Sequence, residues 1–167
     1  MNKRTTQLMV LAALVISVVG NVVLVGTHLR DRRMILSYER SMIGHIDSQL
    51  KVAIRYLDHS IEESTYLREW HRPAAEALIT VGDLVGTLLA SDAPKLKHNM
   101  SVVLPMRALE VESAEEAMRL RTTIYEIMGY LHGWTSEAGN NDFKLAETKE
   151  EFIHRLTLYF EKNPWQD

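Results

Sequence analysis

The chain has 167 residues, with 19 lysine or arginine residues against 22 aspartate or glutamate residues and a formal net charge of −3 at pH 7. This mildly acidic balance, without a basic stripe that interleaves aromatic residues, argues against a nucleic-acid partner. The sequence contains no cysteine, which excludes disulfides and thiolate metal sites.

A nearly uninterrupted apolar run extends from Leu8 to Gly26. At about 1.5 Å per residue, the roughly 20 residues from Gln7 to Thr27 cover about 30 Å, which is the thickness of the hydrocarbon core of a bilayer. We therefore expect a short tail at residues 1–6 and a single-pass transmembrane helix at residues 7–28.

A cleavable signal peptide is the alternative to a retained anchor. Val18-Val19-Gly20 is a weak candidate for a cleavage site. However, the chain stays apolar from Asn21 to Gly26, where the start of a secreted domain normally turns polar. The pattern favours a signal anchor that remains in the membrane.

The orientation in the membrane depends on the flanking basic residues. Lys3 and Arg4 precede the span, and Arg30, Arg32 and Arg33 follow it, so the positive-inside count is nearly balanced. A short N-terminal tail with early basic residues is typical of exported signal-anchor proteins. We expect a cytoplasmic tail and an extracytoplasmic body, with a cytoplasmic body as the alternative.

One face of the expected span is small and polar. Ala13, Ser17 and Asn21 recur every four residues, and Gly20 lies beside them. Small residues allow close approach of a second helix, and lipid offers the Asn21 amide no hydrogen-bond partner. We expect these four residues to form a transmembrane helix interface, although a strongly apolar span also tolerates one asparagine without a partner.

The segment after the span is predicted to be a helix that continues to about residue 65. Its apolar residues fall on one face at intervals of three or four, a spacing also typical of a coiled coil: Ile35, Tyr38, Met42, Ile46, Leu50, Ala53 and Leu57.

A second helix is predicted from about Pro73 to Ala90, with Pro73 in its first turn, or with an earlier start near Ser64. Gly82 and Gly86, four residues apart, leave a thin face where another helix can approach. The apolar stripe of this helix consists of Leu78, Val81, Val85 and Leu88.

The next stretch, Ser91 to Glu110, is less regular: Asp92 and Pro94 can start a short helix, and Pro105 would either interrupt it or mark a new start. The spacing of Ser113 and Glu116 fits a capping box that starts a further helix, which ends before Gly133. The apolar positions of that helix are Ala117, Leu120, Ile124, Met128 and Leu131.

A last helix is predicted after the turn Gly139-Asn140-Asn141, and Asn163-Pro164 ends it. Its apolar positions are Phe143, Leu145, Phe152, Leu156 and Tyr159. Amphipathic helices with short connections and no alternating strand pattern predict an all-α fold, an antiparallel bundle of about four helices at residues 29–163 with a C-terminal tail at residues 164–167.

Few residues suggest chemistry. Glu151 and His154 form a Glu-x-x-His pair, and His59 and Glu62 give the reverse order; di-iron bundles use such pairs with further glutamates. The forward motif occurs once, so these four residues are weak metal-ligand candidates. We assign no catalytic residue and no cofactor, and expect a protein that is not an enzyme.

Aromatic residues offer a second kind of site. Tyr66, Trp70 and Trp134 are candidate partner-binding residues, because tyrosine and tryptophan are enriched at binding hot spots. Packing between helix ends is the alternative explanation for them and for the neighbouring aromatic residues His71, Tyr130 and Trp165.

The sequence thus favours a membrane-anchored interaction or scaffold subunit that acts through a protein partner or a second copy of itself. A cytoplasmic tail of about seven residues is too short for an output domain, so the chain would act by moving a partner. The alternatives are an extracytoplasmic helical bundle that senses a signal or small ligand, and a metal-dependent enzyme of the ferritin-like type.

Overall fold

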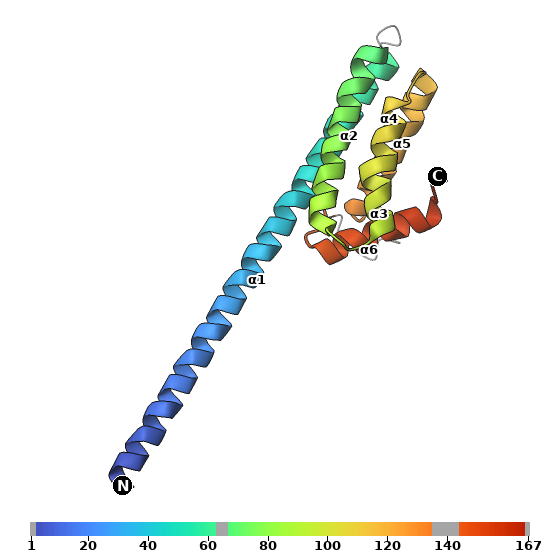
Figure 1. Cartoon of the computed structure of the whole chain (residues 1–167). Helices are drawn as coiled ribbons and strands as arrows, with labels where there is room; N and C mark the ends of the chain where they lie inside the picture. Colours follow the sequence, from blue (N-terminus) through green and yellow to red (C-terminus); the bar gives the residue numbers. More distant parts are fainter. Residues whose placement is uncertain (1–2, 63–66, 135–143, 166–167) are drawn as a thin grey trace. The chain divides into compact units, whose positions relative to one another are not determined.

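The structure is a computed structural model that describes residues 3–62, 67–134 and 144–165 (Figure 1). The described residues contain helices and no strand, which confirms the all-α fold class. In chain order the elements are α1 (Lys3–Glu62), α2 (Leu67–Leu89), α3 (Pro94–His98), the π-helix η2 (Asn99–Val103), α4 (Leu104–Leu109), α5 (Ala114–Leu131) and α6 (Lys149–Lys162).

The contacts within the chain define two units, Met1–Tyr38 and Glu39–Asp167, which we call the N-terminal unit and the helical unit. The N-terminal unit contains the apolar run. Its large apolar side chains from Leu14 to Val25 are all more than half exposed. Among the described residues, α1 is the helix that is long and apolar enough to cross a membrane.

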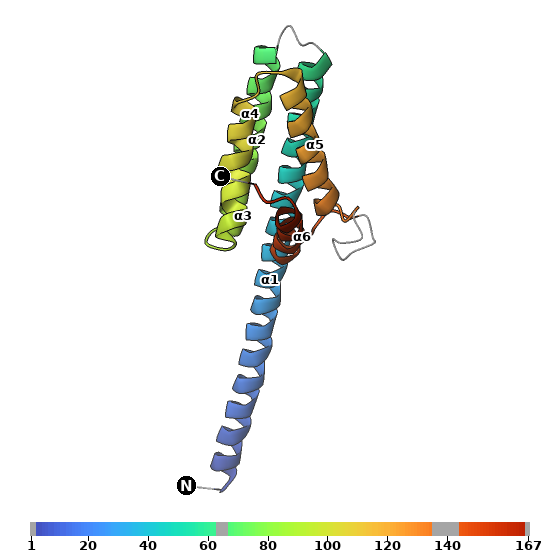
Figure 2. The same cartoon turned by 90° about the vertical axis from the view of Figure 1, so that its right-hand side faces the viewer.

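The helical unit has one hydrophobic core. Figures 1 and 2 both show α2, the run from α3 to α4, and α5 lying alongside the part of α1 that belongs to this unit, while α6 crosses them. The predicted apolar stripes of the second and third long helices are buried, as are Phe152, Leu156 and Tyr159 of α6. The periodicity therefore identified the core-facing sides of these helices correctly.

The stripe of the first helix is buried in part. Met42, Ile46, Leu50, Ala53 and Leu57 are buried, but Ile35 and Tyr38 are 57% and 56% exposed. The shared apolar face is therefore buried from Met42 onward, while its first two members stay exposed. The reason is that both precede Glu39, where the helical unit begins.

The start of α2 also differs from the main expectation. Because the helix begins at Leu67, Pro73 lies inside it and not in its first turn. The proline removes one backbone donor from the helix but does not end it, since Ala74, Ala75 and Leu78 are fully buried just after it. Burial in the core outweighs the loss of one hydrogen bond.

Pro105 lies in the first turn of α4, which begins at Leu104, so of the two expected alternatives the new start is the one observed. The amide of Leu104 donates to the carbonyl of Asn99, five residues earlier, which is π-helical spacing. The wide turn stands immediately before the residue that has no amide to donate. The helical run from Pro94 to Leu109 therefore continues through η2 past the proline.

The helix ends follow local capping rules. Ser113 and Glu116 form the predicted capping box at the start of α5. The last helix begins later than expected, at Lys149, so Leu145 precedes it and Thr148 is its N-cap. Phe143 and the predicted turn at residues 139–141 lie outside the described residues. The helix ends at Lys162, before Asn163-Pro164, as predicted.

The prediction that a glycine face of α2 admits another helix is confirmed at Gly82. A β-carbon placed on Gly82 would lie 2.8 Å from the Cα atom of Ser101 in η2. One placed on Gly86 would lie 3.8 Å from Lys97 Cε, an ordinary contact. The backbones of α2 and η2 therefore approach closely at Gly82, where no side chain fits.

We expect Gly82→Ala to destabilise the protein by about 1–3 kcal/mol, because the added methyl group forces two helix backbones apart. Gly86→Ala is the matched control, and its higher helix propensity should stabilise the protein by up to about 1 kcal/mol. Thermal unfolding of the full chain in detergent, followed by circular dichroism, measures both. Equal melting temperatures for the two variants would contradict the close approach.

Candidate functional site

The C-terminal end of α5 fixes the position of Trp134. Gly133 has a φ of 64°, its amide donates to the carbonyl of Tyr130 at 3.0 Å, and the amide of Trp134 donates to the carbonyl of Gly129 at 2.9 Å. These bonds form a Schellman motif, which favours glycine at the left-handed position. The Trp134 ring comes within 3.7 Å of a β-carbon placed on Gly129, yet it stays 49% exposed.

A buried carboxylate, that of Asp47, holds the histidine on which this tryptophan stacks. The rings of His132 and Trp134 stack with centroids 4.9 Å apart, and His132 Nε2 lies 2.8 Å from Asp47 Oδ1. Asp47 is 6% exposed, and its Oδ2 accepts a hydrogen bond from Lys51 Nζ at 2.6 Å. Trp134 is thus a half-exposed tryptophan on a fixed polar support.

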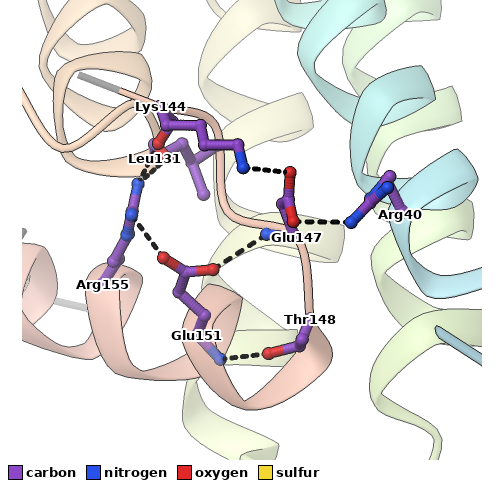
Figure 3. Close-up of polar contacts among 7 residues, drawn as sticks. All are labelled: Arg40, Leu131, Lys144, Glu147, Thr148, Glu151 and Arg155. Carbon is purple, nitrogen blue, oxygen red and sulfur yellow. Dashed lines mark hydrogen bonds and ion pairs between the residues drawn. The ribbon is translucent and has the colours of Figure 1, made fainter. Parts of the chain in front are cut away.

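A second polar cluster surrounds Arg155, which is 1% exposed (Figure 3). Its Nη1 donates to the carbonyls of Leu131 and Lys144, and its Nη2 forms an ion pair with Glu151. A buried guanidinium is tolerated when it is paired and hydrogen-bonded in this way. Arg155 thus ties α6 to the end of α5 and to the segment that precedes α6.

The same cluster reaches α1 through Glu147. Its carboxylate pairs with Lys144 Nζ and with Arg40 Nη2, both at 2.6 Å (Figure 3). The hydrogen bond from Lys144 and the positive charges of Arg40 and Lys144 hold the pKa of Glu147 below its ordinary value. The amide of Glu147 donates to Glu151 at 2.9 Å, so the carboxylate of Glu151 is shared between two donors.

A carboxylate from α1 also caps α6. Glu39 is 9% exposed, and its Oε2 accepts a hydrogen bond at 3.0 Å from the amide of Lys149, the first residue of α6. Negative charge is favourable at a helix N-terminus. Lys149 Nζ in turn pairs with Asp92 at 2.8 Å, and this hydrogen bond and charge raise the pKa of Lys149. These contacts hold α6 in place.

The four metal-ligand candidates do not come together in the described residues. His59 lies against the ring of Trp70, at 4.9 Å between centroids, while Glu62 and His154 are exposed. Glu151 is engaged by Arg155, one helical turn away. The described part of the chain contains no group of three or more His, Cys, Asp or Glu side chains that could hold a metal ion.

The aromatic candidates differ in exposure. Tyr66 lies outside the described residues. Trp70 is half-buried and its ring packs on Tyr56, at 6.2 Å between centroids, and on His59. Trp134 is the more exposed of the two described candidates, so it is better placed to meet a partner.

A cleft of about 700 Å³ lies beside α3 and α6. The sequence did not predict it, because its two walls come from segments about 60 residues apart. The Trp165 ring packs on Phe160 at 4.7 Å between centroids, and the Arg107 guanidinium lies 4.6 Å from the same indole. The cleft is lined by Leu96, Phe160, Pro94, Pro164 and Trp165, together with the polar residues Lys95, His98, Asn99, Thr157 and Glu161.

A buried tyrosine next to this region has a core role. Tyr159 is 1% exposed and meets Tyr130 edge to face, at 5.5 Å between ring centroids. Burial raises the pKa of the Tyr159 hydroxyl to about 12. For Tyr130, packing between helices is therefore the explanation that fits, as the sequence allowed.

The expected transmembrane interface lies on an exposed part of α1. Ser17, Gly20 and Asn21 are exposed, and a β-carbon placed on Gly20 meets no atom within 4 Å. Ala13 belongs to α1, but its side chain lies outside the described residues. This face of the helix is open to a second helix or to lipid.

In comparisons with protein-family models, curated proteins and solved structures, nothing matched the chain.

Replacing Arg155 with methionine should destabilise the protein by about 3 kcal/mol, because two carbonyls and the Glu151 carboxylate lose a donor in a buried position. Arg119→Met is the control: Arg119 pairs with Glu115 on an exposed face, where both side chains are about three-quarters exposed. That pair should contribute less than about 1 kcal/mol. Thermal unfolding measures both, and a similar loss in the two variants would contradict the assigned role.

Proposed function

We propose that the chain is a single-pass membrane protein whose antiparallel helical bundle acts by binding a protein partner. The observation that carries the proposal is the exposure of the apolar side chains of α1 from Leu14 to Val25. A continuous apolar surface of this size is unfavourable in water, and an α-helix satisfies its own backbone groups in lipid.

The span is proposed as a signal anchor with a cytoplasmic tail and an extracytoplasmic bundle. The exposed Ser17, Gly20 and Asn21 support lateral pairing, with a second copy or with another helix, because lipid cannot satisfy the asparagine amide.

Trp134 is the proposed anchor for a partner on the bundle. Asp47 holds His132, and His132 stacks on Trp134, so a contact with the indole costs little ordering of the side chain. Buried tryptophans at the centre of an interface commonly dominate the binding energy.

The alternative proposal is a sensory bundle that binds a small ligand. The cleft beside α3 and α6 favours it, because its volume of about 700 Å³ falls within the usual range for ligand sites and it joins aromatic to polar residues. A ligand that shields Trp165 from a fluorescence quencher and also raises the melting temperature would favour the sensory bundle over partner binding.

Membrane insertion is tested first. The wild-type chain should remain in the membrane pellet after extraction with alkaline carbonate, and Val18→Arg with Val22→Arg should release it, because each arginine at the centre of a span costs about 3 kcal/mol. The control is Ile79→Arg with Val102→Arg in the helical unit, where the two side chains are 45% and 47% exposed. The control variant should stay in the membrane pellet. Release of the wild type by carbonate would overturn the proposal.

The orientation is tested with a single thiol, since the sequence has no cysteine. In intact cells, a membrane-impermeant maleimide should label Ser91→Cys, an exposed position of the helical unit. Labelling of this variant only after the cells are broken would reverse the orientation.

Partner binding is tested by purification of the full chain in mild detergent. A stoichiometric partner or a second copy should copurify, and Trp134→Ala should weaken a bundle-bound partner by about tenfold or more, as expected for a hot-spot residue. Asn21→Leu should weaken pairing in the membrane by a smaller factor, about three- to tenfold. A monomeric wild type without any companion would contradict partner binding, and unchanged association of Asn21→Leu would remove the intramembrane pairing.

A further inference from the structure

A shallow hollow of about 420 Å³ lies on α1 just after the apolar run. Gly26 contributes no side chain to it. Arg30, four residues after Gly26, and Arg33, three residues after Arg30, both line it. The remaining lining residues are Leu29, Met34 and Ser37. Leu29 and Met34 are 50% and 55% exposed, so the hollow joins two guanidinium groups to an apolar rim.

The charge of the chain is divided unevenly around this hollow. Residues 1–38 contain five lysine or arginine residues and one acidic residue, Asp31, while the rest of the chain contains 14 and 21. Asp31 does not line the hollow. On a helix with 3.6 residues per turn, Arg32 also lies away from the face that Gly26, Arg30 and Arg33 share. The hollow is thus a cationic site in an otherwise acidic protein.

The first part of the hollow, up to Arg30, lies at the expected depth of the headgroup layer of a bilayer. With Gly26 at the edge of the hydrocarbon, Arg30 lies about 6 Å beyond it, and headgroups occupy the next 5–7 Å or so on each side. Side chains of a helix tilt toward its N-terminus, so the long side chain of Arg33 leans back toward the headgroup layer. Leu29, about 4.5 Å beyond Gly26, would then lie close to the upper parts of the acyl chains.

We propose that Arg30 and Arg33 form a binding site for the phosphate of an anionic phospholipid, with Gly26 leaving the room for the headgroup. The proposal rests on the membrane span proposed above. One arginine guanidinium can donate two hydrogen bonds to the oxygens of a phosphate, and the lipid phosphate supplies the negative charge that complements this segment. Ser37 adds a hydroxyl at the far end of the hollow.

The test uses the full-length chain reconstituted into vesicles of equal parts phosphatidylcholine and phosphatidylglycerol. After release into mild detergent, native mass spectrometry gives the ratio of retained phosphatidylglycerol to retained phosphatidylcholine. A basic residue near the surface favours anionic lipid by about fivefold, so two should give a wild-type ratio of roughly 20 or more. Arg30→Gln and Arg33→Gln should each lower the ratio about fivefold.

Arg32→Gln is the matched control, because it removes the same charge from the same segment but from another face of α1. It should lower the ratio clearly less than Arg30→Gln or Arg33→Gln does, because Arg32 does not line the hollow. A fall as large as that of Arg33→Gln would overturn the site in favour of diffuse charge attraction, and a wild-type ratio near one would overturn lipid selectivity altogether.

Vesicles of phosphatidylcholine alone separate this proposal from the membrane anchor. A wild-type chain that carbonate removes from these vesicles refutes the anchor and the headgroup site together. A chain that stays in them but shows no preference for phosphatidylglycerol in the mixture refutes the headgroup site and leaves the anchor intact.

Discussion

The structure depends on how the apolar surface of α1 is covered. In the helical unit, Met42, Ile46, Leu50, Ala53 and Leu57 join the same buried core as residues of α2, α5 and α6. Polar contacts then fix the positions of the neighbouring elements: Asp47 holds the end of α5 through His132, and Glu39 holds the start of α6. In the N-terminal unit the protein supplies no such cover among its described residues, and the same requirement leads to the proposed lipid environment.

Local sequence patterns predicted much of the fold. Apolar spacing of three and four identified the buried faces of α2 and α5, and the spacing of Ser113 and Glu116 located the start of α5, because these features depend on neighbours along one helix. The Thr148-x-x-Glu151 pattern carried a similar signal for α6, which the sequence analysis missed. By contrast, spacing alone could not show that Ile35 and Tyr38 stay exposed, since it does not reveal that the helical unit begins only at Glu39.

The polar sites were less predictable for the same physical reason. The sequence made Glu151 and His154 weak metal-ligand candidates. In the structure Glu151 pairs with Arg155, which also donates to the carbonyls of Leu131 and Lys144. A Glu-to-Arg spacing of four residues was the available clue. Nothing in the sequence showed that this arginine is buried, because burial arises from the way the end of α5 meets α6. The cleft beside α3 likewise results from tertiary packing.

The hydrogen bond from the amide of Lys149 to Glu39 links the rotation of α1 about its axis to the stability of the first turn of α6. Each residue step around an α-helix corresponds to about 100°. A twist of α1 by one such step would swing the Glu39 carboxylate away from the first turn of α6 and leave Thr148 as the remaining cap, a loss of about 1 kcal/mol. Rotation of α1 about its own axis would therefore change the hydrogen bonding at the start of α6.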